Sequence, residues 1–440
     1  MASGASAGPH GADRSAGLRN GLRYGLLGLP LAFVALPLYV HLPHVYASRY
    51  GMPLATLGLV LLLARLFDAV TDPWLGRVSD RLFARSPGHL LRACAGAALV
   101  MLAGMALLFF PPWPRPDDAF ALLLMLVITC LAYSLVAIAH QAWGARLGGD
   151  ETQRTRIVAW REGAALVGVV LASVLPTWLG WGEWVAVFGC MLAAGWLAWA
   201  RSRAPEHVAS PAQVAGPWRM ELLHPWRDRG FRWLMAVFVV NGMASAVPAT
   251  LVLFFIQDRL GAPSLEPLFL ATYFVTAAAS MPLWMRLVGR LGLPRSWLAG
   301  MLLSLSVFAW AASLGHGDVL GFWWVCALSG LALGTDLALP GAMLAGMIDE
   351  RGDRGLREGA YFGWWNLAGK LNLALAAGLA LPLLDLLGYR PGTTSADGLQ
   401  ALTLAYAVLP CLLKLLAALA LYLAFVRRRS HSPSSPTEAP

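Results

Sequence analysis

The sequence predicts an all-α membrane protein whose helices cross a bilayer many times. Of its 440 residues, 58% are hydrophobic and only 13% are charged, and the mean hydropathy is +0.61. A soluble protein of this size needs more polar surface than such a composition supplies. Apolar runs of about 20 residues, the length that crosses a bilayer as a helix, recur along the chain.

The apolar segments form two sets of six. The first set covers 23–46, 53–75, 92–111, 119–143, 158–180 and 184–200, and the second covers 231–256, 266–288, 296–314, 319–347, 359–387 and 399–426. Between them, 201–230 is rich in proline, histidine and arginine, which is typical of a linker. We therefore expect twelve transmembrane helices in two six-helix bundles, 23–200 and 231–426, with tails at 1–22 and 427–440.

Arginine residues collect in alternate loops and so indicate the orientation of the spans. One side holds Arg77, Arg81, Arg85 and Arg92 after the second segment, Arg146, Arg154 and Arg156 after the fourth, and others in the linker and at 427–429. The opposite loops hold only Arg49, Arg115, Arg259 and Arg390. Positive residues favour the cytoplasmic side, so both termini are expected there, in a multi-pass protein of a bacterial-type inner membrane. Residues 1–22 lack the apolar core of a signal peptide.

Composition and motifs also limit the function classes. The net charge of +9 is spread over short loops without a long basic stripe, so we expect no nucleic-acid partner. Five cysteines lie in or beside apolar segments without CxxC spacing, which indicates packing rather than disulfides or a metal. No HExxH, GxSxG or DDxxD-like cluster points to an enzyme. We expect no cofactor other than a coupling ion, and a monomer whose partners are the bilayer and a small solute.

The second apolar segment contains charges at a depth where they are costly. Arg65, Asp68 and Asp72 fall at i, i+3 and i+7 of a helix, so they share one face and partly neutralise one another. Thr71 adds a hydroxyl oxygen beside them. Carboxylate and hydroxyl oxygens suit a small hard cation, or a proton on a buried carboxylate. Because ionisable residues in membrane spans usually mark ion or substrate paths, this face predicts such a path.

Lysine is almost absent from the chain, which draws attention to its two occurrences. Lys370 and Lys414 both lie within apolar segments, whereas arginine supplies the positive charge elsewhere. A lysine ammonium can change protonation on burial, which a guanidinium does not. We expect Lys370 to be functional and Lys414 to snorkel toward the membrane interface.

Long stretches of the chain resemble the glycoside-pentoside-hexuronide:cation symporters of the major facilitator superfamily. RLFDAVTDPWLGRVSD at 65–80 is similar to the helix 2 signature of that family, and HQAWGARLGGDETQRTRIVAWR at 140–161 is similar to its helix 4–5 loop. The stretch at 347–389, from MIDERGDRG to the closing Gly-Tyr, resembles the loop 10–11 signature with the helix 11 lysine. The resemblance implies the fold of that superfamily, with two bundles around a central cavity.

The resemblance also implies roles for particular residues. Asp68, Thr71 and Asp72 match cation-site positions, where the two aspartates would hold Na+ if the protein is sodium-coupled. Ser134 matches a hydroxyl ligand of the cation, and Lys370 is placed opposite the aspartates. Arg161 matches the helix 5 arginine that contacts the substrate.

The expected sugar-binding residues differ from the family pattern. No acid stands in the helix 1 stretch GLLGLPLAFV, Ala137 stands at the helix 4 acid position, and Gln141 replaces an aromatic platform. Polar and aromatic residues that could line the cavity instead are His140, Gln141, Arg161, Asn241, Asp336, Trp364, Trp365 and Asn366. Asp336 stands in an apolar run and would be a second proton site or a substrate contact.

These observations predict cation-coupled symport, with Na+ or H+, of a small solute that is sugar-like or an anionic organic molecule. Two alternatives stay open at this stage. One is transport of a lysophospholipid or another amphiphile, with Arg161 meeting an anionic headgroup. The other, which has less support, is a membrane-embedded enzyme that modifies lipids.

Overall fold

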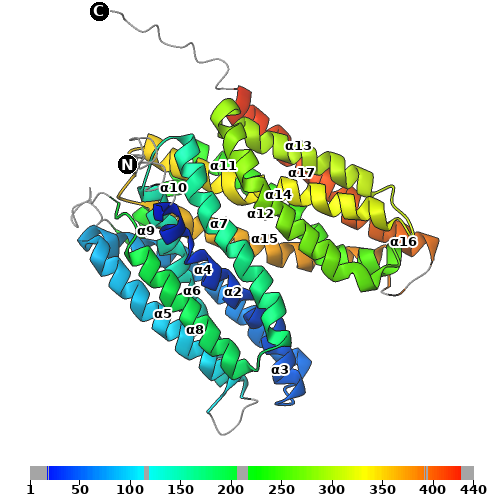
Figure 1. Ribbon diagram of the computed structural model, residues 1–440, viewed down its shortest axis with the longest axis horizontal. Helices are drawn as coiled ribbons and strands as arrows, with labels where there is room; N and C mark the ends of the chain where they lie inside the picture. Colours follow the sequence, from blue (N-terminus) through cyan, green and yellow to red (C-terminus); the bar gives the residue numbers. More distant parts are fainter. Residues whose placement is uncertain are drawn as a thin grey trace, which may run out of the picture. The chain divides into compact units, whose positions relative to one another are not determined.

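The computed structural model is built almost entirely of helices, which confirms the predicted all-α class (Figure 1). It describes residue 17 and residues 19–112, 118–205, 217–390, 392 and 395–427. No strand occurs within those ranges. Most of the predicted tails at 1–22 and 427–440, and the middle of the predicted linker, lie outside the described residues.

The chain forms two compact units. The first contains the residues up to Leu222 together with Ile348–Trp364, and the second contains Leu223–Met347 and the residues from Trp365 onward. The division at Leu222 falls inside the predicted linker, 201–230. Ile348–Trp364, which the sequence suggested as part of the second bundle, packs with the first unit.

Helices of the first unit follow one another closely along the chain. They are α2 (Gly28–Leu36), a π-helical turn (Pro37–His41), α3 (Leu42–Ser48), α4 (Leu54–Arg85), α5 (Pro87–Phe109), α6 (Ala119–Arg146), α7 (Glu151–Val174), α8 (Trp181–Ala200) and the short linker helix α9 (Trp218–Leu222). Pro37 opens the π-helical turn, where a proline removes a backbone donor and interrupts regular helix.

Helices of the second unit include several with irregular turns. They are α10 (His224–Arg227), α11 (Arg229–Phe254), α12 (Glu266–Leu291), α13 (Leu293–Ala311), α14 (Val319–Glu350), α15 (Glu358–Leu386), α16 (Ala396–Thr403) and α17 (Leu409–Leu421). The last turns of α14 and the first turns of α15 belong to the first unit. Two π-helical stretches, Leu404–Val408 and Tyr422–Val426, flank α17.

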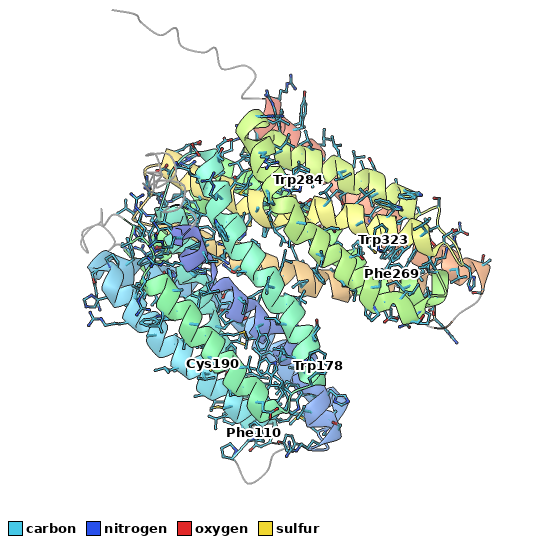
Figure 2. All side chains as sticks on the ribbon, in the orientation of Figure 1. Phe110, Trp178, Cys190, Phe269, Trp284 and Trp323 are labelled. Carbon is cyan, nitrogen blue, oxygen red and sulfur yellow. The ribbon has the colours of Figure 1, made fainter. Side chains whose placement is uncertain are left out.

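Helices cover all twelve predicted apolar segments, and nine of the described helices are long and apolar enough to cross a membrane. The helix α4 is not one of the nine, because Arg65, Asp68 and Asp72 interrupt its apolar run. A count of twelve crossings stays a prediction. Trp178, which is 79% exposed, and Phe110, which is 46% exposed, lie at helix ends of the first unit, as expected of aromatic residues at a membrane interface (Figure 2).

Aspartate side chains fix where several helices begin. Asp118 Oδ1 accepts hydrogen bonds from the backbone N–H groups of Phe120 and Ala121, at 2.9 and 3.1 Å. Asp150 accepts from Gln153 N at 2.7 Å at the start of α7. These bonds satisfy N–H groups that a helix start leaves without intrahelical partners.

Each unit has its own aromatic core. In the first, the ring of Phe33 stacks on Trp184 with centroids 4.7 Å apart. In the second, Phe255 stacks on Tyr406 at 4.2 Å. Offset or parallel ring contacts of this kind add to the stabilisation from burial alone.

Glycines allow α4 and the first turns of α15 to touch through their backbones. A Cβ atom at Gly76 would run into the carbonyl oxygen of Gly359, and one at Gly359 would run into the carbonyl oxygen of Gly76. A Cβ at Gly363 would similarly meet the backbone at Asp72. Only glycine permits this approach, so Ile348–Trp364 can pack on the helix that bears the buried acids.

Replacement of Gly76 by alanine is expected to destabilise the first unit. The added methyl group must displace backbone, which typically costs about 1–3 kcal/mol. We expect a lower apparent melting temperature for the purified Gly76→Ala protein. Gly96→Ala is the matched control, because a Cβ at this mid-helix position of α5 meets nothing within 4 Å. Equal melting temperatures for both variants would contradict the backbone contact.

Candidate functional site

The acids of α4 lie in the interior of the first unit. Asp68 is 2% exposed and Asp72 is fully buried, which confirms that the two share one inward face. Arg65, the third predicted member of this face, is exposed. Ser134 of α6 donates a hydrogen bond from Oγ to Asp68 Oδ1 at 2.7 Å. The structure therefore brings together Asp68 and Ser134, as the family resemblance implied.

Thr71 directs its hydroxyl hydrogen back into its own helix. Its Oγ1 donates to the carbonyl oxygens of Phe67 and Asp68, at 2.9 and 3.0 Å. The lone pairs of the hydroxyl oxygen are still available to a ligand. Two carboxylates and two hydroxyls form the donor set of this region, and such hard oxygen donors fit Na+ or a proton better than a soft metal.

Arg161 of α7 pairs with the neighbouring acid, Glu162. Its Nε and Nη2 donate to Glu162 Oε1 at 3.0 and 2.6 Å. The family resemblance points to Arg161 and not to the residue beside it, so Glu162 was not predicted from the sequence. Arg161, which was predicted to offer a cationic contact, therefore forms an ion pair with Glu162 that has no net charge.

His140, on α6, is completely buried against the helical residues 19–25 that precede α2. Its Nε2 donates to the carbonyl oxygen of Tyr24 at 2.8 Å, and the Tyr24 hydroxyl donates to the His140 carbonyl at 2.9 Å. Its ring also contacts Trp199, with centroids 5.3 Å apart. This environment gives His140 a packing role, whereas the next residue, Gln141, is half-buried.

Asp336 belongs to a buried polar cluster of the second unit. Its Oδ1 accepts from Trp297 Nε1 at 2.9 Å, and its Oδ2 accepts from Lys414 Nζ at 2.7 Å and Ser245 Oγ at 3.2 Å. Lys414 Nζ also donates to Ser245 Oγ at 3.1 Å. Four elements, α11, α13, α14 and α17, therefore converge on one carboxylate.

The expectation that Lys414 snorkels to the interface is wrong. Its side chain is 4% exposed and forms an ion pair with Asp336. A buried ammonium and a buried carboxylate each lose hydration, and pairing compensates both losses. Asp336 is therefore held by a fixed charge partner inside the second unit.

The two adjacent tryptophans of α15 have separate packing partners. Trp364 Nε1 donates to the carbonyl oxygen of Leu222 in the linker helix at 2.8 Å. The ring of Trp365 stacks on Phe238, with centroids 3.7 Å apart. The remaining predicted residues lie in the second unit: Asn241 is buried, and Asn366 and Lys370 are half-buried.

A charged network that sequence reasoning missed closes one end of the first unit. Arg146, at the end of α6, bridges Asp80 at 2.6 Å and Glu358 at 3.1 Å, and all three side chains are almost fully buried. Asp80 also accepts from the backbone N–H groups of Gly359 and Ala360, at 2.7 and 2.9 Å. One arginine and one aspartate thereby fix the start of α15 on α4 and α6.

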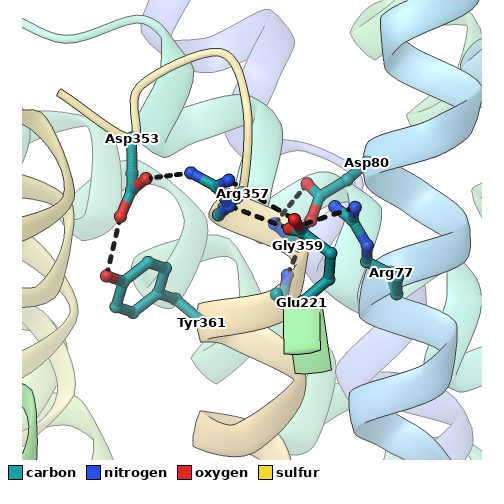
Figure 3. Close-up of polar contacts among 8 residues, drawn as sticks. Arg77, Asp80, Glu221, Asp353, Arg357, Gly359 and Tyr361 are labelled. Carbon is teal, nitrogen blue, oxygen red and sulfur yellow. Dashed lines mark hydrogen bonds and ion pairs between the residues drawn. The ribbon is translucent and has the colours of Figure 1, made fainter. Parts of the chain in front are cut away.

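The linker helix α9 extends this network (Figure 3). Glu221 accepts from Arg77 of α4 at 3.1 Å and from Arg357 at 2.9 Å. Arg357 also pairs with Asp353 at 2.6 Å, and Asp353 accepts from the Tyr361 hydroxyl at 2.9 Å. Burial lowers the pKa of Arg357, but its hydrogen bonds to Glu221 and Asp353 raise that pKa by more, so the guanidinium stays charged.

Removal of the Arg146 charge is expected to destabilise this end of the first unit. Arg146→Gln leaves Asp80 and Glu358 buried without their cation, and breaking a buried pair costs about 3–5 kcal/mol. The apparent melting temperature of the purified protein should fall clearly. Arg85→Gln, at the exposed end of α4, is the control and should leave it unchanged. A melting temperature for Arg146→Gln equal to that of wild type would show that the network adds no stability.

The Lys414–Asp336 pair can be tested with a double-mutant cycle. Lys414→Met alone leaves the buried Asp336 carboxylate without its cation, so the apparent melting temperature of this variant should fall by about 5–10 °C. Asp336→Asn combined with Lys414→Met removes both charges and should recover most of that loss. Additive losses in the double variant would contradict a direct pair.

Apolar helices that contain paired charges are typical of integral membrane proteins that transport ions or solutes. The chain belongs to the MFS/sugar transport protein family, whose model matches residues 23–426. This match confirms the resemblance to the glycoside-pentoside-hexuronide:cation symporters. The family model and the structural neighbours are those of transporters.

Curated relatives agree with this family. The chain is 26% identical over 251 residues to the inner membrane symporter YicJ of Escherichia coli K12, and spans about half of that protein (52%). It is 29% identical over 138 residues to a putative sulfoquinovose importer of Salmonella typhimurium, covering 31% of this chain and 29% of that one.

Two solved structures share the fold. A bacterial homologue of the iron transporter ferroportin in its outward-facing state has a TM-score of 0.69 and 16% identity, over 94% of this chain and 100% of that one. The Escherichia coli fucose:proton symporter FucP has a TM-score of 0.64 and 12% identity, over 91% and 98%.

Proposed function

We propose that this protein is a secondary transporter that moves a sugar-like solute across a bacterial-type inner membrane together with a cation, Na+ or H+. The observation that supports this most directly is the pair of buried carboxylates in α4, with the Ser134 hydroxyl 2.7 Å from Asp68. Acids at this depth are too costly to be retained for packing alone. Their oxygen donors suit a small cation.

In the proposed cycle, a bound cation neutralises Asp68 and Asp72. The solute enters after this neutralisation, and the empty carrier returns once the cation and the solute have left. Lys370 is the further ionisable residue that we propose takes part in the coupling. Coupling of this kind requires that the cation and the solute favour the same conformation, because a ligand shifts an equilibrium only by its differential affinity for the two states.

The proposal also includes twelve crossings with both termini in the cytoplasm. Support comes from the arginine-rich loops at the end of α4 and α6, where the positive-inside rule places the cytoplasm. The Arg146 network lies at that same end.

The sugar-like character of the solute follows from the family and its relatives. The family model describes sugar transport, and relatives include a putative glycoside/cation symporter of Escherichia coli K12 and putative sulfoquinovose importers. Lysolipid transport and lipid modification have no comparable support and are not proposed.

Asp68→Asn is expected to abolish concentrative uptake while leaving the fold intact. Loss of the charge removes the cation site, and accumulation in proteoliposomes should fall about tenfold or more, the factor expected of a coupling free energy of about 1–3 kcal/mol. Uptake of labelled methyl glycosides under sodium or proton gradients is the measurement. Asp397→Asn, at an exposed helix start, is the matched control. Unchanged accumulation by Asp68→Asn would refute cation coupling at this residue.

A further inference from the structure

Glu162 is an acid in the middle of a membrane-type helix that the proposed cycle does not use. It lies near the centre of α7 (Glu151–Val174), one of the helices long and apolar enough to span a membrane. Its side chain is 21% exposed and that of Arg161 is 12% exposed. A charge pair at this depth that keeps partial solvent access marks a ligand path more often than a packing contact.

The position of Glu162 on the helix turns it toward the interior of the first unit. Val158 and Leu166, one turn before and one turn after it, are each only 7% exposed. Residues four apart share a helix face. Val167, on the far side of the helix from Glu162, is 49% exposed, as expected of a surface in contact with lipid. Glu162 therefore does not face the bilayer.

Glu162 and the proposed cation site share an electrostatic neighbour, Tyr133. The Tyr133 hydroxyl of α6 is within electrostatic range of three carboxylates, those of Asp68, Asp72 and Glu162. Tyr133 directly precedes Ser134, which binds Asp68. A solute held at Glu162 would thus lie near the bound cation, as coupled transport requires.

The bonding of the pair defines what it can recognise. Two donor nitrogens of Arg161, Nε and Nη2, converge on one oxygen of the carboxylate, Oε1. Among the described residues, none donates a hydrogen bond to Oε2. The open oxygen accepts hydrogen bonds but donates none. A ligand for this position therefore has to bring hydroxyl or N–H groups.

The balance of charge excludes one class of solute. Because Glu162 already neutralises Arg161, an anion at this position gains little from the guanidinium and is repelled by the carboxylate. A neutral molecule rich in hydroxyls meets neither difficulty, since its hydroxyls donate to Oε2 and their oxygens accept from the guanidinium.

We propose that Glu162, with Arg161, binds vicinal hydroxyls of the solute and makes the transporter selective for neutral glycosides over anionic sugars. This inference rests on the proposed function and names its substrate class. It also decides between the two solute classes that the sequence left open, a sugar-like molecule and an organic anion.

The test measures calorimetric binding of two matched pairs of probes to the purified full-length protein: methyl galactoside with methyl galacturonide, and methyl glucoside with methyl glucuronide. The wild type should bind the neutral member of at least one pair more tightly than its uronide. Glu162→Gln should weaken neutral binding about tenfold to a hundredfold, the range for a hydrogen bond to a charged group. The same substitution should strengthen uronide binding, because the positive charge of Arg161 is then no longer neutralised by Glu162.

Two further variants keep the test decisive. Glu162→Asp retains the negative charge on a side chain that is one methylene shorter. The affinity for the neutral glycosides should therefore fall, and the affinity for the uronides should not rise. Glu183→Gln, an exposed acid at the start of α8, is the matched control and should change neither affinity.

The outcomes separate this inference from the proposed function. Preference of the wild type for the uronides, or an unchanged preference in Glu162→Gln and Glu162→Asp, would overturn the role of Glu162 while leaving sugar transport in place. Binding of none of the four probes to the wild type would overturn the sugar-like solute itself, and the substrate class with it.

Discussion

A charge inside an apolar helix has to find a partner, and this requirement organises both units. Ion hydration is lost at such depths, and only pairing, hydrogen bonding or a bound ion compensates for the loss. Asp68 accepts from Ser134, Arg146 bridges two acids, and Lys414 binds Asp336. In each case a buried charge joins helices that are distant in sequence, so the electrostatics of the chain also fix its packing.

The same principle separates fixed charges from those that can exchange partners. Lys414 and Asp336 are also hydrogen-bonded to Ser245 and Trp297, which favours a permanent pair. Glu162, by contrast, offers an oxygen that no described residue occupies. A transporter needs both kinds: permanent pairs that hold each unit rigid, and open positions at which solute and cation replace protein contacts.

Helical periodicity and hydropathy were enough to predict the all-α class and the shared helix face of Asp68 and Asp72, which is buried. The contact between Ser134 and Asp68 followed from the family resemblance, because it joins residues 66 positions apart. Two features were not predictable: the pairing of Lys414 and the packing of Ile348–Trp364 on the first unit. Both depend on which helices become neighbours, and periodicity within one segment gives no information about its neighbours.

The central claim is that solute and cation bind to one coupled site, and reciprocal linkage tests it most directly. The affinity of the purified protein for methyl galactoside or methyl glucoside should be measured with sodium and with choline, at acidic and at alkaline pH. The account predicts that sodium or protons raise this affinity about fivefold or more, as a coupling free energy of about 1 kcal/mol requires. Equal affinities under all four conditions would contradict it.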